Sequence, residues 1–217
     1  NVTTATSLSS GASMTLDNSM VSPGDALQCN ATVTDPSGES ASDSTSVTIV
    51  NTAPTVSSVS ISPSANVTND ALLTCTSVAS DPDGSIASTA YAWSNVTTGA
   101  ALGSSDTLQL DSSTSSPNDE IQCTVTVTDD SGDTATNAAS VTLDNRNPTV
   151  SLSISPNTGV VTGSSLTCSA TASDADGDTP TLGYAWSNGG TSLGSGQTLV
   201  VSASNSDPGD SLTCTVS

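Results

Sequence analysis

Histidine, lysine and phenylalanine are absent from this sequence, and arginine occurs only once, at Arg146. Without histidine or lysine, the chain lacks the side chains that most often act as general bases near neutral pH. Its aspartates stand in turn-forming runs, away from the apolar surroundings that would raise a carboxyl pKa. A pair of carboxylates would be enough for glycoside hydrolysis, but no other feature points to an active site. We therefore expect a protein that is not an enzyme.

The scarcity of basic residues also limits the partners. The chain has 21 acidic residues against one basic residue, which gives a formal net charge of −20. This charge repels nucleic acid and anionic lipid, so we expect no nucleic-acid partner. No apolar run is long enough to cross a bilayer, so we expect no direct membrane insertion in this segment. The same charge creates a demand for counter-cations.

Low hydrophobicity with high net charge is typical of disorder, but the apolar residues here follow a pattern. In Ile121–Val127 they alternate with glutamine and threonine, and this alternation indicates a strand with one buried face. Such runs are separated by turns rich in glycine, proline, aspartate and asparagine, and no helical period of useful length occurs. The sequence therefore predicts an all-β protein.

A Cys–Trp–Cys pattern occurs twice. The second copy follows the first at a distance of about one small domain. The two copies are Cys75, Trp93, Cys123 and Cys168, Trp186, Cys214. A buried tryptophan against a disulfide between facing sheets is the signature of an immunoglobulin-type sandwich. We therefore expect tandem Ig-like β-sandwich domains in an oxidising compartment, each with one disulfide, Cys75–Cys123 and Cys168–Cys214.

Aligning the chain with itself predicts how the repeats are cut. Asn1-Val-Thr-Thr matches Asn95-Val-Thr-Thr, and a cysteine follows 28 residues later in both, at Cys29 and Cys123. The partner of Cys29 is thus expected outside the chain, and a free reactive thiol is the alternative.

The same alignment gives the domain boundaries. We expect residues 1–52 to be the C-terminal half of an Ig-like repeat, 53–146 a complete repeat, and 147–217 the N-terminal part of a third. In the complete repeat, the expected strands are Val56–Ser62, Leu72–Ala79, Ala90–Ser94, Thr107–Leu110, Ile121–Thr128 and Ala138–Leu143.

Local strings add a resemblance. Ala-Pro-Thr-Val-Ser-Ser-Val-Ser-Ile-Ser-Pro (53–63), Ser-Asp-Pro-Asp-Gly (80–84) and Thr-Val-Thr-Asp-Asp-Ser-Gly (126–132) resemble bacterial Ig-like and PKD-like repeats. Ile121 stands where antibody domains place a tyrosine, so the likeness is to the architecture and not to antibodies. The resemblance implies tandem modules on a large protein outside a prokaryotic cell or on its surface.

The acidic loops are candidate cation sites. Carboxylates two residues apart around a glycine can converge on a hard cation such as Ca²⁺, and the arrangement is similar to cadherin-like junctions. The run lacks the full EF-hand pattern, and Asp-Gly and Asp-Pro also make good soluble turns. Structural Ca²⁺ is the one cofactor we expect. The candidate ligands are Asp81, Asp83, Asp129, Asp130, Asp133, Asp144, Asn145, Asn147, Asp174, Asp176 and Asp178, with Asp35 and Glu39 in the corresponding loop of the first repeat.

Glycans are a weaker expectation. Four Asn-x-Thr sequons occur, at Asn1, Asn30, Asn66 and Asn95. In a chain this rich in serine and threonine, chance produces about as many.

The function expected from these features is structural. We predict a repeat segment of an extracellular filament or cell-surface stalk, with neighbouring repeats and self-association into fibres as its contacts. The alternative is a cell-surface adhesin module that binds a glycan or a partner cell. All four aromatic residues stand at core-like positions, which argues against sugar stacking.

Overall fold

The computed structural model describes residues 1–217, and every regular element in it is a β-strand. Contacts between residues divide the chain into two units, Asn1–Val67 with Ala71–Leu143, and Thr68–Asp70 with Asp144–Ser217. Each unit is treated by itself below. No helix in the structure is long and apolar enough to cross a membrane.

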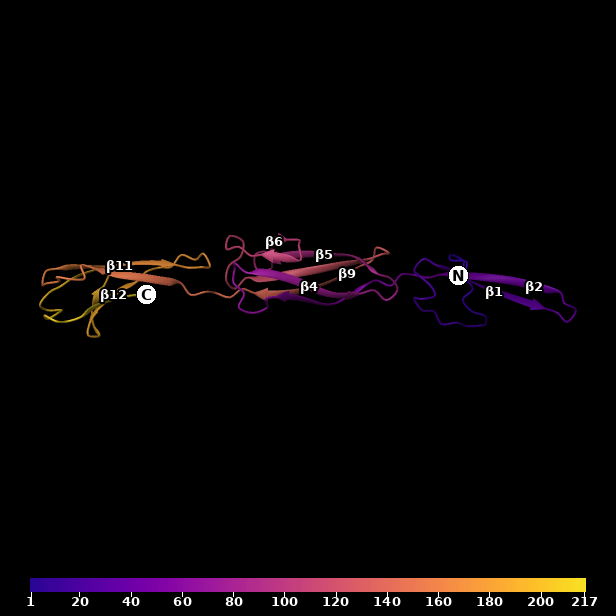
Figure 1. Cartoon of the computed structure of the whole chain (residues 1–217), viewed down its shortest axis with the longest axis horizontal. Helices are drawn as coiled ribbons and strands as arrows, with labels where there is room; N and C mark the ends of the chain where they lie inside the picture. Colours follow the sequence, from indigo (N-terminus) through magenta and orange to yellow (C-terminus); the bar gives the residue numbers. More distant parts are fainter. The chain divides into compact units, whose positions relative to one another are not determined.

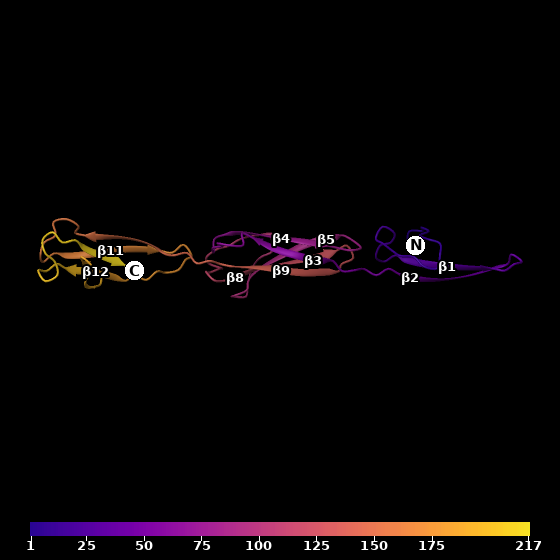
Figure 2. The same cartoon turned by 90° about the horizontal axis from the view of Figure 1, so that it is seen from below.

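The first unit contains one complete Ig-like sandwich, drawn in the magenta part of Figure 1 and seen from below in Figure 2. One sheet has the order β3-β4-β7 and the facing sheet has the order β6-β5-β8-β9. All neighbouring strands are antiparallel. The strands are β3 (Thr55–Ser62), β4 (Leu72–Ser80), β5 (Ile86–Asn95), β6 (Ala100–Gly103), β7 (Thr107–Gln109), β8 (Glu120–Asp129) and β9 (Thr134–Thr142).

Strand β8 shows how the alternating sequence makes this sandwich. Its apolar positions, Ile121, Cys123, Val125 and Val127, have no exposed surface, while the polar residues between them lie partly open. Successive side chains of a strand point to opposite faces, so one face of β8 enters the core. It packs there against Leu73 and other core residues supplied by the facing sheet.

The core is centred on a disulfide and a tryptophan. Cys75 of β4 and Cys123 of β8 are joined across the two sheets, and Trp93 of β5 lies opposite Cys123 in the strand pairing. Trp93 is 1% exposed, and its indole Nε1 donates to the carbonyl of Ser105 at 2.9 Å. The tryptophan thus fills the core while its one polar atom finds a partner.

The second unit repeats this core with the equivalent residues. Cys168 and Cys214 form its disulfide, Trp186 lies opposite Cys214, and the Trp186 Nε1 donates to the carbonyl of Gly196 at 3.0 Å. The two sheets have the orders β10-β11-β14 and β13-β12-β15. The strands are β10 (Thr149–Ser155), β11 (Ser165–Ser173), β12 (Tyr184–Asn188), β13 (Thr191–Ser195), β14 (Thr198–Val200) and β15 (Leu212–Val216).

Residues 1–50 form a two-stranded ribbon of β1 (Ala26–Thr34) and β2 (Ser40–Thr48) with loops before it. The positions that are buried in β8 are open in β1. Val33, which aligns with Val127, is 69% exposed, and Cys29 is a free, exposed thiol. The predicted partner of Cys29 outside the chain stays a prediction.

The fold class, tandem Ig-like β-sandwiches with one disulfide in each of two cores, is the one expected from the Cys–Trp–Cys pattern. Strand ends differ from expectation. Strand β5 begins at Ile86 and not at Ala90. Its first half pairs with β8, and only Ile86 in that half packs against the core, so the apolar alternation there is weak. The predicted boundaries at residues 52 and 146 stay predictions.

The inter-sheet disulfide predicts a large loss of stability when it is removed. A Cys75→Ala/Cys123→Ala double variant should lose about 4 kcal/mol of unfolding free energy, because the bond closes a loop with a sequence separation of 48. Urea unfolding followed by tryptophan fluorescence measures this, since Trp93 and Trp186 each report on one core. The control is Cys29→Ala, which should change stability by less than about 0.5 kcal/mol. Equal effects of the two changes would contradict the assignment.

Candidate functional site

The acidic residues predicted for the complete repeat gather at the end of the sandwich where residues 51 and 52 lead into β3. Asp81 and Asp83 lie in the loop after β4, and Asp129 ends β8. The pairing of β5 with β8 brings these two loops together, because Ile86 lies opposite Asp129. The main-chain N–H of Asp130 then donates to the carbonyl of Ser85 at 3.1 Å.

The segment before β3 is bound to both loops through side-chain oxygens. The Asn51 Nδ2 donates to Asp129 Oδ2 at 2.9 Å and to Asp133 Oδ2 at 2.8 Å. The next residue, Thr52, donates its main-chain N–H to Asp83 Oδ2 at 3.0 Å. Asn51 is not among the predicted ligands. Its bonding partners are distant in sequence, so no local pattern marks it.

Asp129 is ionised in this setting. It is 2% exposed, and burial by itself would raise its pKa. Hydrogen bonds from Asn51 and from the main-chain N–H groups of residues 131–133 oppose this effect, and the net result is a lowered pKa. A buried negative charge therefore lies in the middle of the acidic loops.

Three oxygens in this region have no hydrogen-bond partner. They are Asn51 Oδ1, Asp81 Oδ2 and Asp83 Oδ1, and each is buried. Gly84 lies beside one of them, and a Cβ at this position would stand 2.8 Å from Asp81 Oδ2 and 2.6 Å from Asp130 Oδ1. A larger residue would collide with these carboxylates, so glycine keeps the space next to them open.

The equivalent loop of the second unit is arranged differently. Asp174 Oδ1 accepts the main-chain N–H of Asp176 at 2.7 Å, as Asp81 does for Asp83 in the first unit. Both oxygens of Asp176 are occupied by Arg146, through its main-chain N–H at 2.6 Å and its Nε at 2.8 Å. This ion pair is the closest approach of opposite charges in the unit, and the Asp176 side chain in it has no exposed surface.

Arg146 uses its remaining N–H groups as well. Nη1 donates to Asp70 at 2.9 Å, and Nη2 donates to Asn69 Oδ1 at 2.9 Å and to the carbonyl of Ala175 at 2.8 Å. The bonds to Asp70 and Asp176 raise the pKa of Arg146. Thr68 and Arg146 in turn lower the pKa of Asp70.

The predicted cation site of the third repeat stays a prediction. Both oxygens of Asp176 accept hydrogen bonds from Arg146, which supplies positive charge at this position. The remaining candidates, Asp144, Asn145, Asn147 and Asp178, are exposed. No group of three or more carboxylate or cysteine side chains in the structure stands ready to hold a metal ion.

The loop of the first repeat acts as a turn. Asp35 Oδ1 accepts the main-chain N–H groups of Ser37 and Glu39, both at 2.9 Å. This is the side-chain capping that makes aspartate common in turns.

Two of the predicted glycan acceptors have a structural role instead. The Asn95 Nδ2 donates to Asp119 Oδ2 at 2.7 Å and is buried, and the Asn1 Nδ2 donates to Asp25 Oδ2 at 2.6 Å. A glycan would be attached to this same nitrogen, and Asn95 has no exposed surface. The glycan acceptors stay predictions. Asn30 and Asn66 are exposed.

We call this pairing the Asn–Asp clasp, and it recurs in the second unit. There the Asn188 Nδ2 donates to Asp210 Oδ2 at 2.6 Å. In both clasps the aspartate accepts hydrogen bonds from a main-chain N–H and from the asparagine amide, and these bonds lower its pKa. For Asp210 the donors are Asp207 and Asn188. For Asp25 they are Ser22 and Asn1. The matching Asn-Val-Thr-Thr strings thus mark a repeated hydrogen bond.

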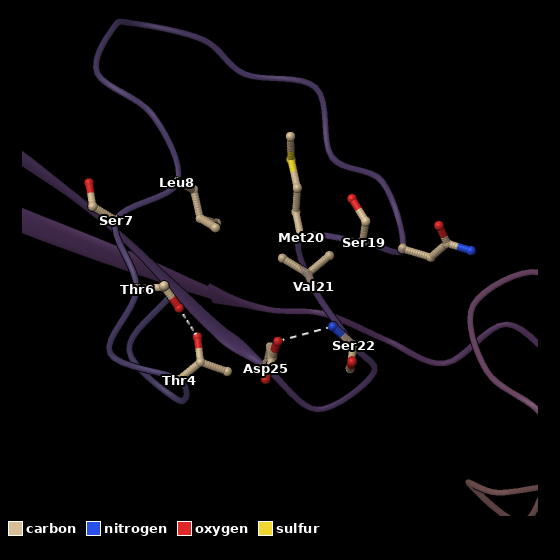
Figure 3. Close-up of a pocket in the computed structure, with 10 residues that line it drawn as sticks. Thr4, Thr6, Ser7, Leu8, Ser19, Met20, Val21, Ser22 and Asp25 are labelled. Carbon is tan, nitrogen blue, oxygen red and sulfur yellow. Dashed lines mark hydrogen bonds between the residues drawn. The ribbon is translucent and has the colours of Figure 1, made fainter.

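A cavity of about 400 Å³ lies among the loops of residues 1–25. Figure 3 shows Asp25 as the only ionisable side chain labelled there, accepting a hydrogen bond from the Ser22 main-chain N–H at 3.0 Å. Since its pKa is lowered, Asp25 is a charged acceptor at neutral pH and is not placed to donate a proton. The other lining residues are Thr4, Thr6, Ser7, Leu8, Asn18, Ser19, Met20 and Val21.

Comparison with known proteins gives a likeness of structure. No protein-family model and no curated protein matches the chain. Among solved structures, it is similar to the three N-terminal domains of the bacteriophage RB49 Highly Immunogenic Outer Capsid protein (Hoc), with 17% sequence identity and a TM-score of 0.29. The match covers 76% of this chain, which spans 58% of that chain.

The Asn–Asp clasp can be tested against the glycan interpretation with two sequon asparagines. Asn95→Ala should lower the unfolding free energy by about 1.5–3 kcal/mol, because it removes a buried hydrogen bond to a carboxylate. Asn30→Ala is the control and should change it by less than about 0.5 kcal/mol, since Asn30 is exposed. Denaturant unfolding measures both. A neutral Asn95→Ala change would contradict a structural role for the clasp.

Proposed function

We propose that this chain is a non-catalytic structural segment of an extracellular filament or cell-surface stalk of a prokaryote. The observation that carries this proposal is the repetition of one buried core. Cys75, Trp93 and Cys123 recur as Cys168, Trp186 and Cys214 with the same disulfide, the same strand pairing and the same indole hydrogen bond. Repeated units of the same fold make a longer chain of domains, and each unit is stabilised by its own core.

The chemistry of the surface supports a structural role. Asp25, the ionisable group in the cavity among residues 1–25, is held as a charged acceptor. The chain offers no histidine or lysine for proton transfer, and its one arginine is occupied by Asp70 and Asp176. These features support a chain whose ionisable side chains serve folding and not catalysis.

The aromatic residues separate this proposal from the adhesin alternative. Trp93 and Trp186 are 1% exposed, and the two tyrosines are partly buried. Sugar-binding surfaces typically present exposed aromatic rings for stacking, and this chain presents none. The disulfides suit an oxidising space outside the cell, where such a segment would work.

Self-association can be tested by electron microscopy of the native material. Negative-stain electron microscopy should show continuous fibres if the chain is a filament segment, or uniform rods projecting from the cell if it is a stalk. The control is the same material after a reducing treatment that opens the two disulfides. Rods that all end in a distinct head, with binding to cells or glycans retained by this segment alone, would favour the adhesin and contradict the proposal.

The disulfides also predict a mechanical property that a stalk or filament needs. When the chain is pulled from its ends, the residues between Cys75 and Cys123 stay closed by the bond, so a separation of 48 residues is not extended. Reduction should therefore lengthen the unfolded complete domain by about 160–170 Å, at about 3.3–3.6 Å per residue. Single-molecule force spectroscopy with and without reductant measures this change. Equal contour lengths would show that the bond does not limit extension.

A further inference from the structure

Three buried oxygens of the first unit lack the hydrogen bonds that such atoms require. Asn51 Oδ1, Asp81 Oδ2 and Asp83 Oδ1 accept nothing from the protein. Native structures rarely leave a buried polar atom without a partner, and the penalty is greatest for a charged group. Two of these three atoms belong to carboxylates, so a positively charged partner would stabilise them best.

Hydrogen bonds connect the residues that carry these oxygens. Asp83 accepts the Thr52 main-chain N–H at 3.0 Å, which brings it to the residue that follows Asn51. Its own main-chain N–H donates to Asp81 Oδ1 at 3.1 Å. In each carboxylate one oxygen is thus used to build the loop, and the other is left over.

The orientation of Asn51 is fixed as well. Its Nδ2 faces the carboxylates of Asp129 and Asp133, both of which can only accept while they are ionised. The amide oxygen must then face the other way. Asn51 Oδ1 is therefore held as a further acceptor, without a donor on the protein.

The second unit shows what satisfies the equivalent oxygen. Asp176 aligns with Asp83, and Arg146 aligns with Thr52, since Arg146-Asn-Pro-Thr-Val corresponds to Thr52-Ala-Pro-Thr-Val. Asp176 Oδ2 accepts the Arg146 main-chain N–H, just as Asp83 Oδ2 accepts that of Thr52. Asp176 Oδ1 then accepts the Arg146 Nε at 2.8 Å, whereas Asp83 Oδ1 has no partner.

The first unit therefore has Thr52 in place of the cationic arginine, while the carboxylate of Asp83 is still present. Thr52 cannot supply the charge, and the chain has no other basic residue. The three orphaned atoms are all oxygens, from two carboxylates and one amide, and this is the ligand set that hard cations prefer. Asp129 and Asp133 add negative charge around the site, and Gly84 keeps the space beside Asp81 open.

We propose that Asn51 Oδ1, Asp81 Oδ2 and Asp83 Oδ1 bind a Ca²⁺ ion that takes the place held by the Arg146 guanidinium in the next repeat. Water and main-chain carbonyls complete the shell, as is common for Ca²⁺. Only two carboxylates contribute directly, which agrees with the absence of a three-carboxylate metal group. Asp129 and Asp133 are positioning residues that act through Asn51. The site does not depend on the proposed filament or stalk role.

The test uses the full chain and calcium chloride in about 150 mM salt, which screens diffuse binding to exposed acids. Isothermal titration calorimetry should give a dissociation constant of about 10⁻⁴–10⁻³ M, the range of extracellular Ca²⁺ modules. Asp83→Asn should weaken binding at least about tenfold, because loss of even an outer-shell partner has that effect. Asp43→Asn, an exposed acid on β2, is the matched control and should bind as the parent does.

Thr52→Arg provides the decisive variant, because it copies the solution of the second unit. It should abolish Ca²⁺ binding at this site, and its melting temperature should be independent of Ca²⁺ and EDTA, whereas that of the parent should rise with Ca²⁺. The proposal is overturned if the parent binds no Ca²⁺, or if Asp83→Asn or Thr52→Arg binds it as tightly as the parent. Since Asp83→Asn keeps the size of the side chain, it decides the matter even if Thr52→Arg fails to fold.

Discussion

The disulfide between the two sheets, packed beside a tryptophan, is the interaction on which each repeat depends. The chain has no phenylalanine and only two tryptophans, so large apolar side chains cannot supply the core by number. Each core instead has one indole at its centre and one covalent bond across it. The acidic loops meet at one end of this sandwich because β5 pairs with β8 and places Ile86 opposite Asp129.

Charge is the second constraint, and it acts where those loops meet. With 21 acidic residues and one arginine, the chain cannot neutralise its carboxylates one by one. Most of them are exposed or cap turns, as Asp35 does, and water solvates them. Asp129 and Asp176 are buried, so they need partners from the protein. Asn51 and main-chain N–H groups stabilise the first, and Arg146 stabilises the second.

The sequence was sufficient to predict the Ig-like core, because its signals are local or periodic. Alternation marked β8, and equal spacing marked the Cys–Trp–Cys sets. It was insufficient for Asn95, whose sequon suggests a glycan, and for Asn51, which reads as an ordinary linker residue. Their roles depend on acceptors 24 and 78 residues away, and such pairs become visible only when the sandwich has closed. The strand β6 (Ala100–Gly103) was missed because its short run carries no strong apolar alternation.

Aligned positions in the two repeats show how a tandem array can differ while its fold stays constant. Thr52 and Arg146 occupy the same place before the first strand of their repeats, and their main-chain N–H groups make the same bond to the aspartate of the following loop. This hydrogen bond forms with either side chain, because only the main-chain N–H takes part in it. Arg146 supplies positive charge to the second carboxylate oxygen from inside the protein, whereas Thr52 supplies none. In the calcium proposal, the repeat with threonine obtains that charge from solution, so the stability of its loops depends on the cations around it. Under the same proposal, variation at this single position makes one repeat sensitive to its surroundings and its neighbour insensitive, without any change in the core that both share.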